Sequence, residues 1–304
     1  MITSAHLFNA ANWLRLGAVS DDFRHLDTGG RAAAWLAGET RRTVMAATAT
    51  AVLLSWLVLA WMAASLPPEA IGPGGGLIAW LPLPEAGGLV SAFLELCLSP
   101  FAASGPLQYA ALAAMWFLTS VAMMLPSAAP MIRTYCEIAD TAAAACKAAV
   151  HPAFLIAGYL TVWLAAALAF AAVSLMTIAA SPTDAPTKGI VAAAALGIAG
   201  LWQFSSLKEA CLTKCRAPFA TLFANWSNRA GGVYRLGLKQ GLWCLGCCWA
   251  LMLVMFAVGI MNLFWMALIG LFAVAEKTEK GRAISLVAGT ILLVWAAALL
   301  VVSL

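Results

Sequence analysis

An apolar stretch of 34 residues, 242–275, runs through the C-terminal half of the chain without a single charged side chain. As one straight helix it would be about 51 Å long, because an α-helix rises about 1.5 Å per residue. The hydrocarbon core of a bilayer is only about 30 Å thick, so one helix of this length would need a severe tilt. We therefore expect two short helices that turn at the Gly-Ile-Met-Asn sequence of residues 259–262.

The composition extends this interpretation to the whole chain. Of its 304 residues, 63% are hydrophobic and 10% are charged, whereas about a quarter of the residues of a soluble protein are charged. This composition predicts an all-α fold, a polytopic membrane helix bundle in contact with the lipid bilayer. The formal net charge is only +4, and no basic run is long enough to indicate a nucleic-acid partner.

The sequence predicts about seven transmembrane helices once the long apolar stretch is split in two. Residues 1–42 form a more polar N-terminal arm that we expect to be cytoplasmic or interfacial, and residues 43–304 form the helix bundle. Residues 131–149 either continue the second span or return along the surface. The predicted spans are 44–65, 106–130, 151–178, 190–204, the two halves of 242–275, and 287–302.

The basic residues indicate the orientation of the bundle. With seven helices and a cytoplasmic N-terminus, sixteen of the seventeen Lys and Arg residues fall on the inner side, and only Lys188 falls outside. With a single span across 242–275, the segment 276–282 and its basic residues would move outside. Because basic residues concentrate in cytoplasmic loops, we expect seven spans, a cytoplasmic N-terminus and an outer C-terminus.

Sulfur-containing side chains follow one face of the first half of the long apolar stretch. On a helix, four of these residues lie within about 80° of one another around the axis: Cys244, Cys248, Met252 and Met255. Cys247 lies to one side of the face that they form. Soft thiolate and thioether ligands select Cu(I), and thiolates also bind zinc and iron–sulfur centres. Methionine and free cysteine are also ordinary apolar filler in packed helices, so packing remains open as the alternative.

A second cysteine pair, Cys211 and Cys215, lies in the polar segment 207–240 that precedes this stretch. The spacing of four residues puts both cysteines on one helix face, as it does for Cys244 and Cys248. If the two pairs fold together, four sulfurs converge near the cytoplasmic side. A metal site, packing cysteines and a redox thiol pair all remain open. Nearby basic residues would favour the thiolate forms: Lys208, Lys214 and Arg216.

The second predicted span offers further soft ligands, Met123 and Met124, close to two prolines. Pro126 and Pro130 remove backbone donors and loosen the inner end of that helix. Methionines near such a kink could face the sulfur-containing side chains of the long apolar stretch. As in the case of that stretch, packing is the alternative interpretation.

We expect no charged side chain inside the bundle. Glu276 and Lys277 end the sixth predicted span and are expected to lie in solvent as an interfacial pair. A membrane transporter usually carries buried charges that mark its substrate or proton path, so their absence argues against transport. The three histidines are scattered along the chain, which argues against a haem held by paired histidines.

Three segments of the sequence resemble one bacterial family. They are LKEACLTKCRAP at 207–218, the segment from GLWCLGCCW to FAVAEK at 241–277, and AMMLPSAAP at 122–130. These segments are similar to a domain-of-unknown-function family catalogued as predicted metal-binding integral membrane proteins. The resemblance implies a multi-pass topology and a metal site, with two methionines as additional ligands: Cys211, Cys215, Cys244, Cys247, Cys248, Met123 and Met124.

Three functional hypotheses follow. The first is a multi-pass protein of the cell inner membrane that binds a soft transition metal near the cytoplasmic face, for metal handling or as a redox centre. Copper is the favoured metal, with zinc and iron as alternatives. The second is a structural or assembly subunit of a larger membrane complex, in which the sulfur serves packing, and the third is a small-solute transporter. The candidate metal ligands are Cys211, Cys215, Cys244, Cys247, Cys248, Met123, Met124 and Met252.

Overall fold

The computed structural model describes residues 40–64, 66, 88, 92–93, 105–144, 149–179, 185–279 and 281–304. Within these residues it contains nine helices and no strand, which confirms the all-α prediction. The predicted arm, residues 1–42, lies almost wholly outside the described residues, as do Cys97 and Cys146. The helices are α2 (Thr40–Ala64), α5 (Pro106–Ala144), α6 (Ala153–Ala179), α7 (Ala185–Gln203), α8 (Ser206–Arg216), α9 (Pro218–Ala224), α10 (Ala230–Val258), α11 (Leu263–Thr278) and α12 (Ala283–Ser303).

Five helices of the described chain, α2, α5, α6, α10 and α12, are long and apolar enough to cross a membrane. α7 and α8 pass the same test together but are bent by 64° at the break between them, so they bring the number to six if they form one span. α11 has only 16 residues. Several long apolar helices are compatible with a multi-pass membrane protein, and the seven spans and their orientation stay predictions.

The long apolar stretch folds in two where the sequence predicts a turn. α10 ends at Val258 and α11 begins at Leu263. Gly259 has a φ of 105°, a left-handed conformation that glycine adopts without the steric penalty of a Cβ. The Asn262 side chain then accepts a hydrogen bond from the Trp265 backbone N–H at 3.3 Å and caps α11. A glycine therefore ends one helix and an asparagine begins the next.

α5 continues through both of its prolines to Ala144, so it extends the second predicted span and does not return along the surface. Its 39 residues give it a length of about 58 Å, which exceeds a bilayer core. Pro126 has no N–H to donate to the Ala122 carbonyl. The Trp56 side chain of α2 donates to that carbonyl at 3.0 Å, so α2 supplies the hydrogen bond that the proline removes.

α10 begins at Ala230, well before the apolar stretch, so Cys244 lies near the middle of a 29-residue helix. α10 packs against α6, α7, α8 and α11. Its contact with α6 brings the two backbones together, since a Cβ on Gly237 would lie 2.1 Å from the Leu155 carbonyl oxygen. A side chain of any size at this position would push the helices apart.

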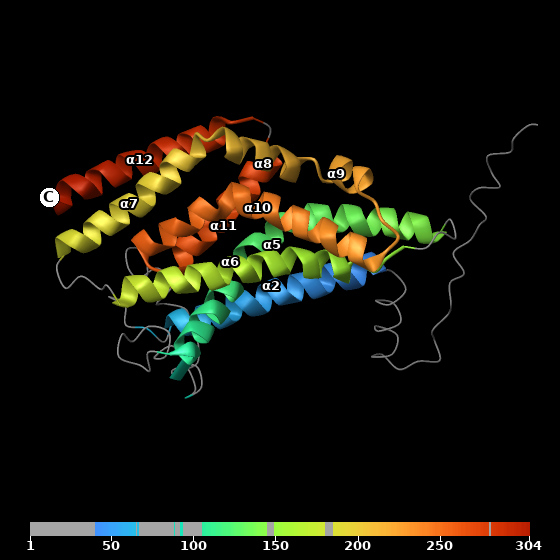
Figure 1. Ribbon diagram of the computed structural model, residues 1–304, viewed down its shortest axis with the longest axis horizontal. Coiled ribbons are helices and arrows are strands. Elements are labelled where there is room, and N and C mark those ends of the chain that lie inside the picture. The colour runs from blue at the N-terminus through green and yellow to red at the C-terminus, as the bar shows by residue number, and fades with distance from the viewer. Residues whose placement is uncertain are drawn as a thin grey trace, which may run out of the picture.

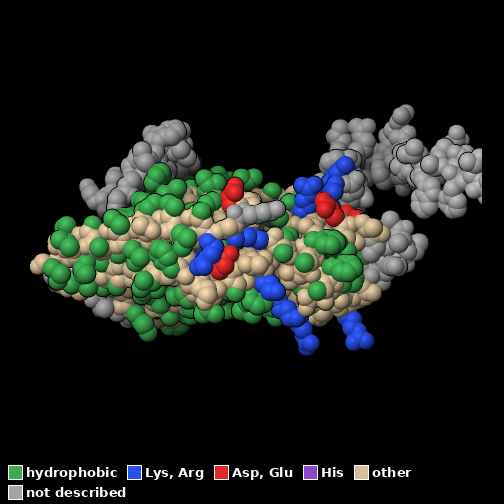
Figure 2. Space-filling view, turned by 90° about the horizontal axis from the view of Figure 1, so that it is seen from above, with side chains coloured by type: hydrophobic (Ala, Val, Ile, Leu, Met, Phe, Trp, Pro, Cys, Tyr) green, Lys and Arg blue, Asp and Glu red, His purple; other side chains and the backbone are tan. Residues whose placement is uncertain are grey.

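Figure 1 shows the helices running back and forth along one long axis, with α7 and α12 side by side next to the C-terminus. On the face seen in Figure 2, charged side chains gather away from the end that carries the C-terminus, and hydrophobic side chains cover that end. The described part of the chain therefore has an apolar end and a more polar end. This division is what a helix bundle partly embedded in lipid requires.

Candidate metal centre

Three buried thiols form a group near the middle of α10. Cys244, Cys247 and Cys248 are free, and their exposed fractions are 2%, 0% and 1%. The Cys247 and Cys248 sulfurs lie 3.1 Å apart, and the Cys247 thiol donates to the Cys244 carbonyl at 3.1 Å. The Cys244 thiol also interacts with both other thiols. The CLGCC sequence thus places three sulfurs together because its spacing follows one side of the helix.

Lys277 of α11 lies against this group. Its Nζ donates to the Cys244 Sγ at 3.1 Å and to the Ser127 Oγ of α5 at 2.6 Å. The Tyr159 hydroxyl of α6 lies 3.1 Å from the same sulfur. The expectation that Lys277 lies in solvent is wrong, because α11 folds back against α5 after the turn and its last residues reach the thiols. A thiolate at Cys244, or a metal bound to it, therefore has a cationic neighbour.

α8 brings the second cysteine pair to α10. The Cys211 sulfur lies directly against Gly246, where an added Cβ would be 2.6 Å from it. Cys215, one turn further on, interacts with Cys247 and lines a small cavity together with Cys244. The two cysteine pairs thus lie close to each other, because α8 packs against α10. Gly246 permits this approach because it has no side chain.

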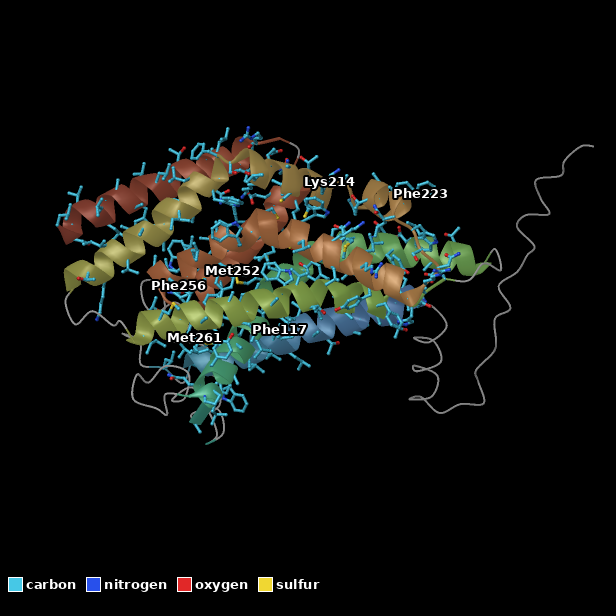
Figure 3. All side chains as sticks on the ribbon, in the orientation of Figure 1. Phe117, Lys214, Phe223, Met252, Phe256 and Met261 are labelled. Carbon is cyan, nitrogen blue, oxygen red and sulfur yellow. The ribbon has the colours of Figure 1, made fainter. Side chains whose placement is uncertain are left out.

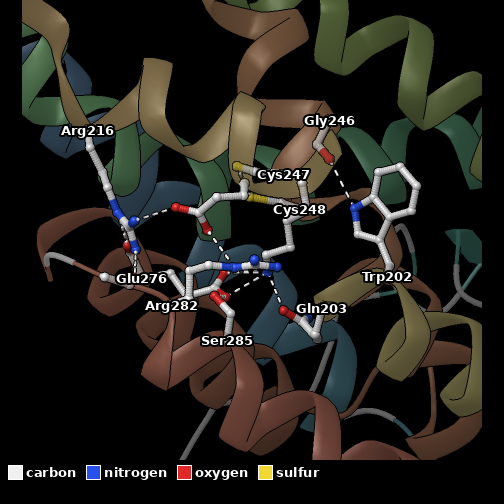
Figure 4. A network of polar contacts seen from close by, with 12 residues as sticks. Trp202, Gln203, Arg216, Gly246, Cys247, Cys248, Glu276, Arg282 and Ser285 are labelled. Carbon is white, nitrogen blue, oxygen red and sulfur yellow. Dashed lines mark hydrogen bonds and ion pairs between the residues drawn. The ribbon is translucent and has the colours of Figure 1, made fainter. Parts of the chain in front are cut away.

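A buried ion pair holds α8 in this position. Lys208 Nζ donates to both oxygens of the Glu276 carboxylate, at 2.6 and 2.8 Å, and both side chains are 1% exposed. The same ammonium donates to the Gln203 side chain, and the Ser285 hydroxyl donates to the carboxylate at 2.6 Å. Figure 4 shows this network where α7, α8, α11 and α12 meet, with Cys247 and Cys248 next to it. Four helices are therefore joined at one buried charge pair.

The ion pair corrects two expectations from the sequence. Glu276 does not lie in solvent, and the bundle does bury charged side chains. The absence of buried charge therefore no longer argues against transport. The sequence concealed the pair because its members are 68 positions apart. Arg216 strengthens the same junction, since its Nε donates to the Glu276 backbone carbonyl at 2.9 Å.

The three methionines predicted as ligands lie in the packed core. Met123, Met124 and Met252 are at most 1% exposed. Figure 3 shows Met252 on the same part of α10 as Phe256, towards the turn into α11. None of the three lines the cavity beside Cys244. Their positions are those of packing residues in the described structure.

Met131 lines that cavity together with Cys215 and Cys244 and was not predicted from the sequence. Met131 follows Ser127 by four residues and so shares its helix face, but only the structure identifies Ser127 as a residue of the site. Gln240 and Tyr159 also line the cavity and were not singled out. Gln240 lies one helical turn before Cys244 on α10 and so shares its helix face, whereas only the packing of α6 against α10 brings Tyr159 to the thiols.

Among the residues that the structure describes, no group of three or more His, Cys, Asp or Glu side chains is arranged to hold a metal ion. The thiols instead hydrogen-bond one another. Metal binding would require the liganding thiols to lose protons and reorient. The donors nevertheless suit a soft metal, because the cavity lining includes sulfur and no carboxylate or imidazole.

Comparison with known proteins matches most of the chain to a family model. Residues 113–299 match the profile of a family described as PpoB2, copper chaperone. No curated protein and no solved structure matches the chain. The matched region runs from α5 into α12 and so includes the thiol group, Lys277 and the buried ion pair. A metal-related family is in line with the resemblance drawn from the sequence.

Proposed function

Because the chain belongs to the PpoB2 family of copper chaperones, we propose that it is a multi-pass protein of the bacterial inner membrane that binds Cu(I) and passes it on. Copper is its cargo, held by the thiols of α10 and α8. This role deepens the first hypothesis from the sequence, metal handling. Copper transfer by a chaperone does not require a permanently bound redox centre.

The observation that carries the proposal is the contact between Lys277 and Cys244, at 3.1 Å, within a group of buried thiols. A Cu(I) ion bound by two thiolates carries one net negative charge. The Lys277 ammonium would neutralise this charge, and a neutral assembly is much less costly to bury than a charged one. Soft sulfur donors also favour Cu(I) over harder metal ions.

The same arrangement provides a route for transfer. Cu(I) moves between thiolates by ligand exchange, in which one Cu–S bond forms as another breaks and the oxidation state stays the same. Each thiol that binds gives up its proton, and each thiolate that is released takes one back. Cys215 and Cys247 interact across the two helices, so α8 offers sulfur next to the thiols of α10. An acceptor with sulfur ligands would receive the ion in the same way.

Copper binding by the purified full chain in detergent tests this proposal. We expect the wild-type protein to hold Cu(I) against a chromophoric Cu(I) chelator under anaerobic conditions. Cys244→Ser should weaken binding by at least about tenfold, because it removes a ligand, and loss of even an outer-shell partner costs that much. The control is Cys136→Ser, which alters a buried free cysteine of α5 outside the thiol group.

Two results would refute the copper role. One is a wild-type protein that retains no Cu(I) at any chelator concentration tested. The other is a Cys244→Ser variant that binds Cu(I) as tightly as the Cys136→Ser control. Tighter binding of Zn²⁺ than of Cu(I) would replace copper by zinc as the cargo.

A further inference from the structure

We propose that the cargo Cu(I) sits in a small cavity between α5, α8 and α10, bound by the sulfurs of Met131, Cys215 and Cys244. This inference rests on the proposed copper role and specifies its ligands. The cavity has a volume of about 20 Å³. Such a volume holds one water molecule or one ion and excludes an organic ligand. Besides these three residues, its lining includes Gln240, Tyr159 and Lys277.

The three sulfurs come from three different helices. Met131 lies on α5, Cys215 on α8 and Cys244 on α10. Ligands on separate helices can surround an ion, whereas Cys247 and Cys248 are neighbours on one helix and do not line the cavity. Two thiolates and one thioether form a soft set of donors that selects Cu(I).

An unsatisfied donor in the same cavity points to a missing ligand. The Gln240 side chain is 4% exposed, and its Nε2 has no hydrogen-bond partner. Leaving a buried donor unpaired costs about 1–3 kcal/mol, so such groups are rare. A thiolate sulfur holding Cu(I) would accept this hydrogen bond. Gln240 would then donate to the complex from one side, while Lys277 provides the positive charge.

Met131 also has a different environment from the methionines singled out in the sequence. It is 6% exposed and borders the cavity, whereas Met252 is fully buried and does not. The two residues therefore form a matched pair, since replacement by leucine removes one sulfur in each case and nearly conserves volume. Only Met131→Leu removes sulfur from the cavity.

The experiment compares Met131→Leu with Met252→Leu in the full-length protein. X-ray absorption at the copper edge counts the sulfur neighbours, and chelator competition measures affinity. We expect the sulfur count to fall by one and the affinity to fall by about tenfold or more in Met131→Leu only. An unchanged count and affinity in Met131→Leu overturns the inference. If Cys244→Ser still loses Cu(I), the proposed function survives that result.

A second measurement needs no substitution and so does not depend on the variant folding. Wild-type protein grown with selenomethionine should show a selenium neighbour in the copper-edge spectrum, because one ligand is a methionine. A spectrum with sulfur neighbours only would exclude Met131 as a ligand. Failure of Cys244→Ser to weaken binding would instead refute the copper role itself.

Discussion

The Lys277 ammonium places a positive charge beside the thiol group. The ammonium bridges Cys244 and Ser127, and thereby joins α10 and α5 to the last turn of α11. Lys277 is half-buried, and an ammonium that is partly removed from water is stabilised by an anionic partner. Cu(I) bound by thiolates supplies such a partner. We therefore expect the positive charge of the side chain at position 277, and not the length of that side chain, to determine how tightly copper binds.

The Lys277→Met variant tests this expectation at the level of one residue. It keeps most of the volume and removes the charge, so the copper–thiolate complex would carry an uncompensated negative charge. We expect Cu(I) affinity to fall by about 10- to 100-fold, the range seen for outer-shell partners of metal ligands. Chelator competition provides the measurement.

Two further lysine variants show whether the effect is specific. Lys277→Arg retains the positive charge and should recover most of the affinity. Lys214→Met removes an exposed lysine from α8, the helix that carries Cys215, and should leave binding unchanged. Equal affinity in Lys277→Met and wild type would show that the ammonium does not balance the complex.

At the level of helices, the Lys208–Glu276 pair determines where α8 lies. α8 has only 11 residues, too few to be stable without tertiary contacts. Its Ser205 N-cap and the ion pair are therefore important for its position. Since α8 carries Cys211 and Cys215, the same ion pair indirectly places two of the five candidate thiols.

Breaking the ion pair should destabilise the protein strongly. Lys208→Met leaves the Glu276 carboxylate buried without its partner, and such changes cost about 3–5 kcal/mol. The double variant Lys208→Met with Glu276→Leu removes both charges, so we expect it to be more stable than Lys208→Met alone. Unfolding in detergent, followed by circular dichroism against temperature, measures both.

An exposed ion pair in the same protein is the control. Arg133 and Glu137 of α5 interact at 2.9 Å, with 66% and 44% of their side chains exposed. Because water screens such pairs, Arg133→Met should change stability by less than about 1 kcal/mol. A Lys208→Met variant as stable as Arg133→Met would show that the buried pair does not hold α8.

At the level of the whole molecule, the helix lengths and the charge distribution bear on orientation. The five longest helices all satisfy the requirements for a membrane span. On the face shown in Figure 2, charged side chains gather away from the C-terminal end of the bundle. Because cytoplasmic segments are enriched in Lys and Arg, this distribution supports an outer C-terminus.

Reporter fusions test that orientation. An enzyme that is active only outside the cytoplasm should be active when fused after Leu304 and inactive when fused after Glu279, between α11 and α12. A fusion at Lys188, near the start of α7, should be active, because this is the one basic residue expected outside. An active reporter after Glu279 together with an inactive reporter after Leu304 would show that the orientation is the opposite of the predicted one.

Much of the helical organisation could be predicted because it depends on neighbouring residues. The length of the apolar stretch required a break, and Gly259 and Asn262 provided one through a left-handed φ and a helix cap. The spacing of four put each cysteine pair on one helix face, but the approach of the two pairs depended on how α8 packs against α10. In contrast, the start of α10 at Ala230 was not predicted, because its first turns mix glycine and basic residues with apolar ones and so lack the continuous apolar pattern of a membrane helix.

The sequence by itself determined that this protein is a bundle of apolar helices and that sulfur lies on one side of α10. Only the tertiary structure decided which residues meet that sulfur. The local sequence allows the Glu276 and Lys277 side chains either to lie in water at a helix end or to pack beside an opposite charge. Lys208, 68 positions away, selects burial for Glu276, and Cys244, 33 positions away, selects a half-buried position for Lys277. Met131 of α5 likewise joins the site only through the packing of other helices, because no local pattern in the sequence specifies which helix faces will be in contact.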